Sequence, residues 1–74
     1  MRSKQDRWFS GWCRAMEGWT PDRYPTTHRA EQEGTDAERK GCEAFWQHRP
    51  DLQPYWSVGK TMGLNPYTAE GDAR

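Results

Sequence analysis

The sequence predicts an all-α protein, a small bundle of three to four short helices with long connecting loops. Three observations support this class: apolar residues recur at helical spacing, no stretch alternates apolar and polar residues, and prolines fall between the helical stretches. A chain of 74 residues forms one domain at most and buries only roughly 60% of its unfolded surface. We expect residues 1–67 to form a single helical domain and residues 68–74 a disordered C-terminal tail.

The core must be built from few aliphatic residues. The sequence contains no Ile, one Val and two Leu, but five Trp and three Tyr. Few aliphatics combined with a strong net charge would indicate disorder, whereas this chain has a formal net charge of zero. Because each aromatic ring can bury about 150–250 Å², we expect a folded domain with a core of Trp, Met, Ala and Gly.

The first helix is expected at about residues 4–17. Ser3 and Asp6 give a helix start, with a short acceptor at the cap and a carboxylate in the first turn. Gly18 gives a C-terminal stop. The helix carries two adjoining apolar stripes, one of Trp8, Trp12, Ala15 and Trp19 and the other of Phe9, Cys13 and Met16.

A connecting loop is expected over residues 19–27, which hold two prolines. A stripe of small residues follows within 28–48, at steps of four and three: Ala30, Gly34, Ala37, Gly41, Ala44 and His48. Glycine in a helix interior costs roughly 0.5–1 kcal/mol relative to alanine. Two glycines on one stripe therefore indicate a contact that a Cβ atom would block.

The start of this second helical region has two interpretations. Thr35 and Glu38 form a capping-box pattern, which favours a break or kink at Gly34 and a new helix from Asp36. The alternative is one helix over 28–48. The end is set by the residue before Pro50, which disfavours helix at that position.

A third helix is expected from a cap at Asp51 to about Met62, with Pro54 in its first turn. Its apolar side would consist of Leu52, Tyr55, Trp56 and Met62, and Gly59 would be a point of close approach. Residues 63–67 then turn the chain.

No metal, cofactor or catalytic site is expected. The candidate ligands Cys13, Cys42, His28 and His48 form no closely spaced pair of the kind that zinc sites use, and His48 suits a helix C-terminus. The sequence contains no G-x-S-x-G, phosphate-binding loop or H-E-x-x-H. We therefore expect a protein that is not an enzyme.

The cellular setting expected is the bacterial host cytosol. The longest apolar run is two or three residues, and no stretch is typical of a signal peptide or a membrane span. The two cysteines fit the cytosol as reduced thiols, and a single Cys13–Cys42 disulfide is the alternative.

Recognition of a partner is the expected activity, because Trp, Tyr and Arg are over-represented at binding hot spots. Residues 1–14 carry a net charge of +3 and residues 31–43 a net charge of −3. Such a balance suits a charged protein groove better than a long phosphate track. We expect the rings of the first helix to fill an apolar pocket while its cations face an acidic rim. The predicted partner-binding residues are Arg2, Lys4, Arg7, Trp8, Trp12, Arg14 and Trp19.

Two strings resemble a known family. Residues 8–16, WFSGWCRAM, resemble the W-x-x-G-W-x-x-A-M helix of ribosome modulation factors, and residues 41–45 with Asn65-Pro66-Tyr67 resemble the G-x-x-A and P-Y parts of that group and of related small phage proteins. This resemblance implies a ribosome-associated factor that binds rRNA. In size and in its Trp-rich helical character, the chain is also similar to bacteriophage-encoded regulators that bind host RNA polymerase, inhibit initiation and sometimes promote antitermination.

The leading hypothesis is a non-catalytic regulator that docks on a host macromolecular machine, with RNA polymerase as the first candidate and the ribosome as the second. Nucleic acid is a secondary contact in this hypothesis, and neither a membrane nor a small-molecule substrate is expected. A third class is a self-assembling protein whose copies pair through the stripe of small residues.

Overall fold

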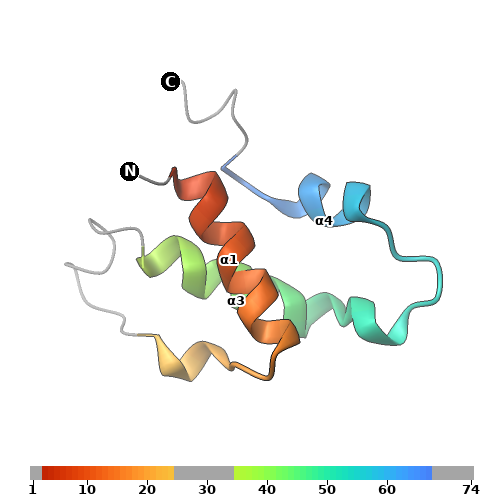
Figure 1. Cartoon of the computed structure of the whole chain (residues 1–74), viewed down its shortest axis with the longest axis horizontal. Helices are drawn as coiled ribbons and strands as arrows, with labels where there is room; N and C mark the ends of the chain where they lie inside the picture. The colour runs from red at the N-terminus through yellow and green to blue at the C-terminus, as the bar shows by residue number, and fades with distance from the viewer. Residues whose placement is uncertain (1–2, 25–34, 68–74) are drawn as a thin grey trace.

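The computed structural model describes residues 3–24 and 35–67. Within these ranges every regular element is helical, and no strand is present, so the all-α prediction is confirmed. In Figure 1, α1 crosses α3, and α4 is set apart to one side of the pair. The elements in chain order are α1 (Lys4–Met16), the 3₁₀ turn η1 (Pro21–Arg23), α3 (Thr35–His48), the 3₁₀ turn η2 (Pro50–Leu52) and α4 (Val58–Leu64).

Helix α1 begins and ends where its end signals predict. The hydroxyl of Ser3 accepts a hydrogen bond from the backbone N–H of Asp6 at 3.2 Å, which satisfies one of the free donors of the first turn. At the other end the N–H of Gly18 donates to the carbonyl of Ala15 at 2.9 Å. Gly18 has φ = 108°, in the region that favours glycine, so it terminates the helix as expected.

The crossing of α1 and α3 is a contact between two backbones. A Cβ atom on Gly41 of α3 would overlap the carbonyl oxygen of Trp8 and lie 2.8 Å from its carbonyl carbon. A Cβ atom on Gly11 of α1 would overlap the carbonyl oxygen of Glu38 and lie 2.6 Å from its carbonyl carbon. The close contact predicted for Gly41 is confirmed, and Gly11 is its counterpart.

The stripe of small residues therefore packs against another helix of the same chain. Ala37 and Gly41 are both buried, which covers these two positions and counts against pairing of copies through them. Helix α3 begins at Thr35, one residue before the predicted start at Asp36. Ala44 and His48 of the stripe are half-buried. The first two stripe positions, Ala30 and Gly34, lie outside the described residues, as do the end of the predicted loop at 25–27 and the predicted tail at 68–74.

Aromatic rings and small residues fill the space around the crossing. Trp12 stacks on Trp8 with ring centroids 5.6 Å apart and meets Phe45 edge-on at 5.6 Å. The expected methionine contribution is wrong: Met16 is 57% exposed, because it lies on the flank of α1 rather than on the face that contacts α3. The buried side chains of this core are Trp8, Trp12, Ala15, Tyr24, Cys42 and Phe45.

The predicted helix from Asp51 to Met62 is wrong. Gln53 has extended backbone angles (φ −113°, ψ 111°), as expected for the residue before Pro54. Helix α4 starts only at Val58, where the hydroxyl of Ser57 accepts a hydrogen bond from the N–H of Lys60 at 3.3 Å. The stretch is thus divided into η2, an irregular segment over 53–57 and a helix of seven residues.

The side chains of this region also differ from the prediction. Leu52 and Tyr55 are exposed instead of forming an apolar helix face. Gly59 is no point of close approach, since the nearest atom to an added Cβ is the Ser57 hydroxyl at 3.7 Å.

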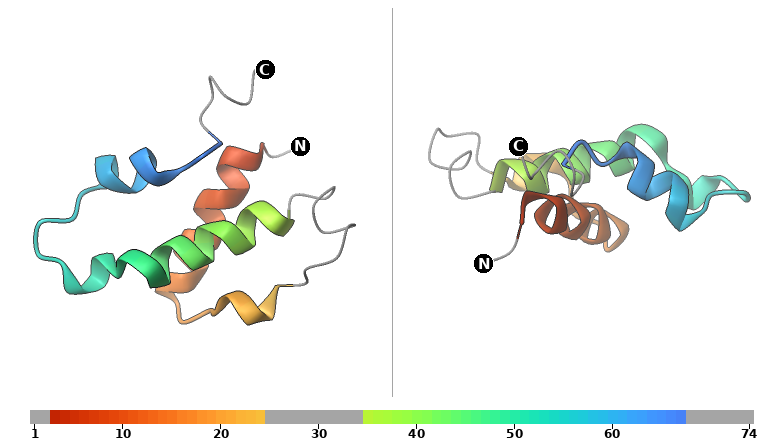
Figure 2. Two further views of the ribbon diagram at one scale, coloured as in Figure 1. Left: turned by 180° about the vertical axis from the view of Figure 1, so that it is seen from behind. Right: turned by 90° about the horizontal axis from the view of Figure 1, so that it is seen from above.

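The segment after α4 returns to the start of α1. Gly63 belongs to α4, so the turn predicted over 63–67 begins two residues later. Asn65 is buried, and its side-chain amide donates to the carbonyl of Gln5 at 3.1 Å. Both views in Figure 2 show this segment beside the beginning of α1. The chain therefore passes along one side of the α1–α3 pair between η2 and Asn65, and the candidate site lies there.

Candidate binding groove

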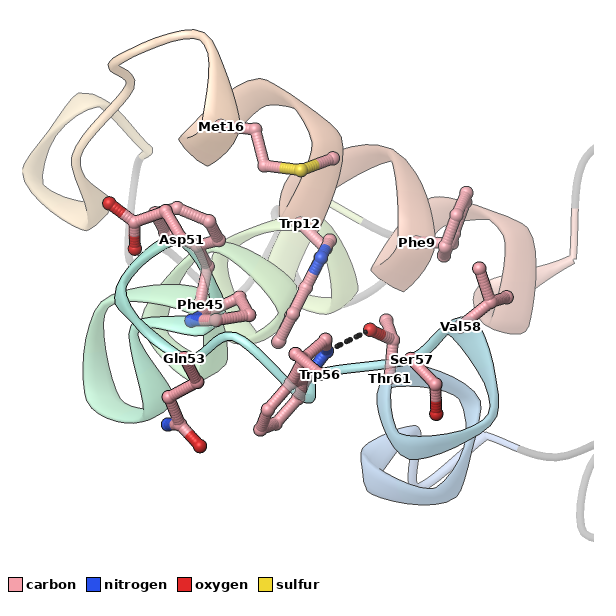
Figure 3. A pocket seen from close by; sticks show the side chains of 11 residues that line it. Phe9, Trp12, Met16, Phe45, Asp51, Gln53, Trp56, Ser57, Val58 and Thr61 are labelled. Carbon is pink, nitrogen blue, oxygen red and sulfur yellow. Dashed lines mark hydrogen bonds between the residues drawn. The ribbon is translucent and has the colours of Figure 1, made fainter.

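A hollow of about 310 Å³ lies between α1, the C-terminal end of α3 and the segment that leads into α4. Figure 3 shows the side chains that line it. Trp12 and Phe45, both buried, contribute from the helix pair, and Trp56 contributes from the irregular segment. Phe9, Met16 and Val58 line the hollow at its exposed edge. We call this hollow the apolar groove.

Trp56 is held in place on two sides. Its ring stacks on Trp12 with centroids 5.9 Å apart, and its indole N–H donates to the hydroxyl of Thr61 at 2.7 Å; the latter bond is drawn in Figure 3. Thr61 is itself buried in α4. The short helix and its capping Ser57 therefore fix the ring, and the groove is a built feature of the fold.

Large apolar side chains are exposed around this groove. Val58 is 72% exposed, Met16 57% and Phe9 36%. Leu52, Tyr55 and Met62 are exposed on the neighbouring segment. Exposed apolar residues that gather in one region, unlike scattered ones, are typical of interaction surfaces.

Charge is scarce along the groove. Among the described residues that line it, only Asp51 is charged. The guanidinium of Arg49 donates two hydrogen bonds to that carboxylate, at 2.9 and 2.7 Å, and thereby lowers the pKa of Asp51. The groove thus presents apolar surface with one compensated acid at its edge.

Two of the predicted tryptophan anchors are buried. Trp8 is 1% exposed and Trp12 2%, so neither of these two rings is an exposed anchor of the first helix. The reason is the glycine contact between α1 and α3, which draws both rings between the helices. Trp12 still lines the inner wall of the groove, although its ring is buried.

The third predicted anchor, Trp19, is half-buried beside two arginines. The Cζ atom of Arg14 lies 4.7 Å from the centroid of the Trp19 ring, and that of Arg23 lies 4.1 Å from it. The structure thus brings together two predicted site residues, Arg14 and Trp19. It adds Arg23, which the sequence argument did not include.

The remaining predicted cations do not join the groove. Lys4 is exposed at the start of α1, and Arg7 lies 3.5 Å from the carboxylate of Glu38. Arg2 lies outside the described residues. Arg7 precedes Phe9 by two residues, as Arg14 precedes Met16, and two residues correspond to a rotation of roughly 200° about the helix. Arg7 and Arg14 therefore lie on the flank of α1 opposite to the groove edge at Phe9 and Met16.

Sequence reasoning missed the edge of the groove. Phe9 and Met16 were assigned to an apolar stripe but not to the site, and Val58 had no assigned role. One available signal was Ser57, which is a typical N-cap residue immediately before Val58. Placing the helix start there would have left Trp56 free to turn toward the helix pair.

Neither thiol has the character of a nucleophile or a ligand. Both cysteines are free, with Cys42 buried and Cys13 half-buried. Burial raises the pKa of both thiols, and the charge of Glu17 adds to this effect at Cys13. Within the described ranges no three His, Cys, Asp or Glu residues gather so that they could hold a metal; His28 lies outside those ranges.

In the part of the chain that the structure describes, no helix has the length and apolar character needed to cross a bilayer. The chain matches no protein-family model, no curated protein and no solved structure. The fold and the site thus define the class in structural terms alone: a small all-α protein with an open apolar groove beside a glycine-mediated helix crossing.

Proposed function

We propose that this protein is a non-catalytic regulator that binds a protein partner through the apolar groove, and that host RNA polymerase is the partner to test first. The observation that carries the proposal is the set of exposed side chains, Phe9, Met16 and Val58, along a groove with aromatic walls. In water these side chains are poorly solvated, and covering them releases about 25 cal/mol per Å² of apolar surface.

A protein partner fits this groove better than a small molecule or a nucleic acid. Its volume of about 310 Å³ is at the lower end of the roughly 300–1,000 Å³ of ligand pockets, and it opens onto further exposed apolar residues. Phosphates would find no cation among the described lining residues, where Asp51 is the charged one. The occupant is therefore an apolar side chain of a protein surface, placed above Trp12 and Phe45.

Cations on the other flank of α1 have a different role in this proposal. Lys4 and Arg14 are exposed but lie away from the groove. Charges outside a contact accelerate association and select partners more than they raise affinity. They would steer the protein toward an acidic surface, which replaces the expectation that they line the rim of the contact itself.

The choice of RNA polymerase rests on the similarity in size and Trp-rich helical character to phage regulators of that enzyme. Two modes of regulation are consistent with docking on RNA polymerase. A bound protein that covers a surface required for promoter recognition inhibits initiation, and one that stays bound during elongation acts in antitermination. Transcription in vitro from one promoter upstream of one terminator separates the two modes.

Binding to purified bacterial RNA polymerase, measured by biolayer interferometry, tests the proposal. Met16→Glu places a charge at the groove edge, and we expect it to weaken binding at least tenfold, the size of a moderate hot-spot loss. The matched control is Gln47→Glu, which adds the same charge at an exposed position of α3 outside the groove. We expect this control to bind within twofold of the wild type, and circular dichroism checks that both variants fold.

Two results would contradict the proposal in different ways. Equal binding of Met16→Glu and wild-type protein to polymerase would remove the groove as the docking surface. Binding to purified ribosomes but not to polymerase, with affinity that falls steeply with salt, would favour the ribosome-associated alternative.

A further inference from the structure

A second surface lies at the end of α1, where three arginines lie against two tryptophans. Arg14 and Arg23 lie over the ring of Trp19, with Cζ-to-centroid distances of 4.7 and 4.1 Å. Arg49 lies over Trp46 at 4.9 Å. The two tryptophans are joined, because the indole N–H of Trp46 donates to the backbone carbonyl of Trp19 at 2.6 Å. We call these five residues the arginine–tryptophan cluster.

Two of its cations repel each other without a direct counter-charge. Because Arg14 and Arg23 share one ring, their Cζ atoms are no farther apart than 8.8 Å, the sum of their distances to the Trp19 centroid. No carboxylate of the described residues lies within 4.0 Å of either guanidinium, whereas Arg49 has its acid partner in Asp51. An anion that contacts both guanidinium groups would offset part of this repulsion.

Two neighbouring acids lower the net charge of this surface. Glu17 follows Arg14 by three residues, and Asp22 directly precedes Arg23. Neither carboxylate lies within 4.0 Å of the Arg14 or Arg23 guanidinium, so both guanidinium groups can still contact a phosphate.

We propose that the arginine–tryptophan cluster binds a single-stranded nucleic acid, with Arg14 and Arg23 on its phosphates. A guanidinium is a planar fork that matches phosphate oxygens in pairs. The flat face of a guanidinium group that lies over a tryptophan ring is itself a surface on which an unpaired base can stack. Stacking favours nucleotides over an acidic peptide, whose carboxylates have no ring to place there.

This inference does not rest on the groove or on its partner. Arg14 and Met16 lie on opposite flanks of α1, so a phosphate on Arg14 does not cover the edge of the groove at Met16. Loss of one binding activity with retention of the other would show that the two sites act separately.

The test uses the full chain and a fluorescein-labelled single-stranded RNA of twelve nucleotides, followed by anisotropy at several salt concentrations. The variant R14Q/R23Q removes the two cluster cations that would contact phosphates, and K40Q/K60Q removes the same charge at exposed positions outside the cluster. We expect R14Q/R23Q to weaken binding at least tenfold. Its slope of log affinity against log salt should be shallower by about 1.4, which is about 0.7 for each lost phosphate contact. K40Q/K60Q should keep the wild-type slope.

Further probes distinguish the possible sources of the anion. Single-stranded DNA of the same sequence should bind comparably, which supports the shared phosphodiester chemistry, and duplex RNA should bind more weakly because its bases cannot stack on the cluster. Polyglutamate that competes as well as RNA would overturn the proposal in favour of an acidic peptide. Absence of RNA binding at low salt, or equal losses in the two double variants, would also overturn it.

A measurement on the wild-type chain covers the case in which R14Q/R23Q fails to fold. Indole N–H signals in a ¹H–¹⁵N spectrum are assigned by single Trp→Phe variants, and RNA is then added. Shifts of the Trp19 and Trp46 signals with little change at Trp12 support the cluster. Shifts confined to Trp12 and Trp56 would place the RNA in the groove and overturn the proposal.

Discussion

The crossing of α1 and α3 is most directly tested by adding one methyl group. Gly41→Ala places a Cβ atom against the carbonyl group of Trp8, 2.8 Å from its carbonyl carbon and 3.1 Å from the backbone nitrogen of Trp12. All these atoms belong to the backbone of α1, so no side chain can rotate to make room. The two helices must separate instead, and the rings packed around the crossing lose contact.

The magnitude follows from two opposing effects. Overpacking of this kind costs typically about 1–3 kcal/mol, and backbone obstruction places Gly41→Ala toward the upper end. The higher helix propensity of alanine offsets about 0.5–1 kcal/mol of this loss in unfolding free energy. A net loss of about 2 kcal/mol is large for a chain of this size, whose unfolding free energy is expected to be about 4–11 kcal/mol. It corresponds to a Tm lower by about 8–16 °C.

The Tm of each variant is measured by thermal unfolding, followed by circular dichroism. The matched control is Gly63→Ala in α4, where an added Cβ meets no atom within 4 Å. Only the propensity term acts there, so Gly63→Ala should raise the Tm slightly. The two substitutions should therefore change stability in opposite directions. If Gly41→Ala raised the Tm as Gly63→Ala does, the backbone contact between α1 and α3 would be refuted.

Two further predictions concern titrating groups. The hydrogen bond from Arg39 lowers the pKa of Asp36, so its contribution to stability is fully present above the unfolded value of about 4 and is lost as pH falls through the folded pKa. Urea unfolding is measured at pH 7 and pH 3. Between these pH values the free energy of unfolding should fall less for Asp36→Asn than for the wild type, and an equal fall would contradict this. Burial raises the pKa of both thiols, so iodoacetamide should alkylate the folded protein slowly at neutral pH and faster toward pH 9. Mass spectrometry should find Cys13 modified before Cys42, and the reverse order would contradict the burial of Cys42.

The ends of α1 were predictable because their signals are local. Ser3 bonds to an N–H three residues away, and Gly18 supplies a positive φ at its own position. Neither depends on the rest of the fold. The small-residue stripe was informative for a related reason: Gly41 weakens its own helix, so its presence indicated a tertiary contact that repays the cost.

The region after α3 was predicted poorly because its signals conflict. Asp51 and Ser57 are both good helix starts, and Pro54 is acceptable in a first turn. Pro54 also disfavours helix at Gln53, which is extended, and this local signal was not used. The later start is further supported by Trp56, whose ring stacks on Trp12 and whose indole N–H bonds to Thr61. Stacking across 44 residues of sequence is not visible in local spacing.

The sequence by itself determined that this chain is helical, because apolar residues recur at helical spacing. It also determined where α1 begins and ends and that Gly41 makes a contact closer than side chains allow, because both follow from backbone preferences at or near one residue. Only the tertiary structure decided which apolar residues are covered. The crossing at Gly11 and Gly41 buries Trp8 and Trp12 and leaves Phe9 and Met16 on the flank. Burial depends on which helix lies opposite, and a periodic pattern specifies a face without specifying its partner.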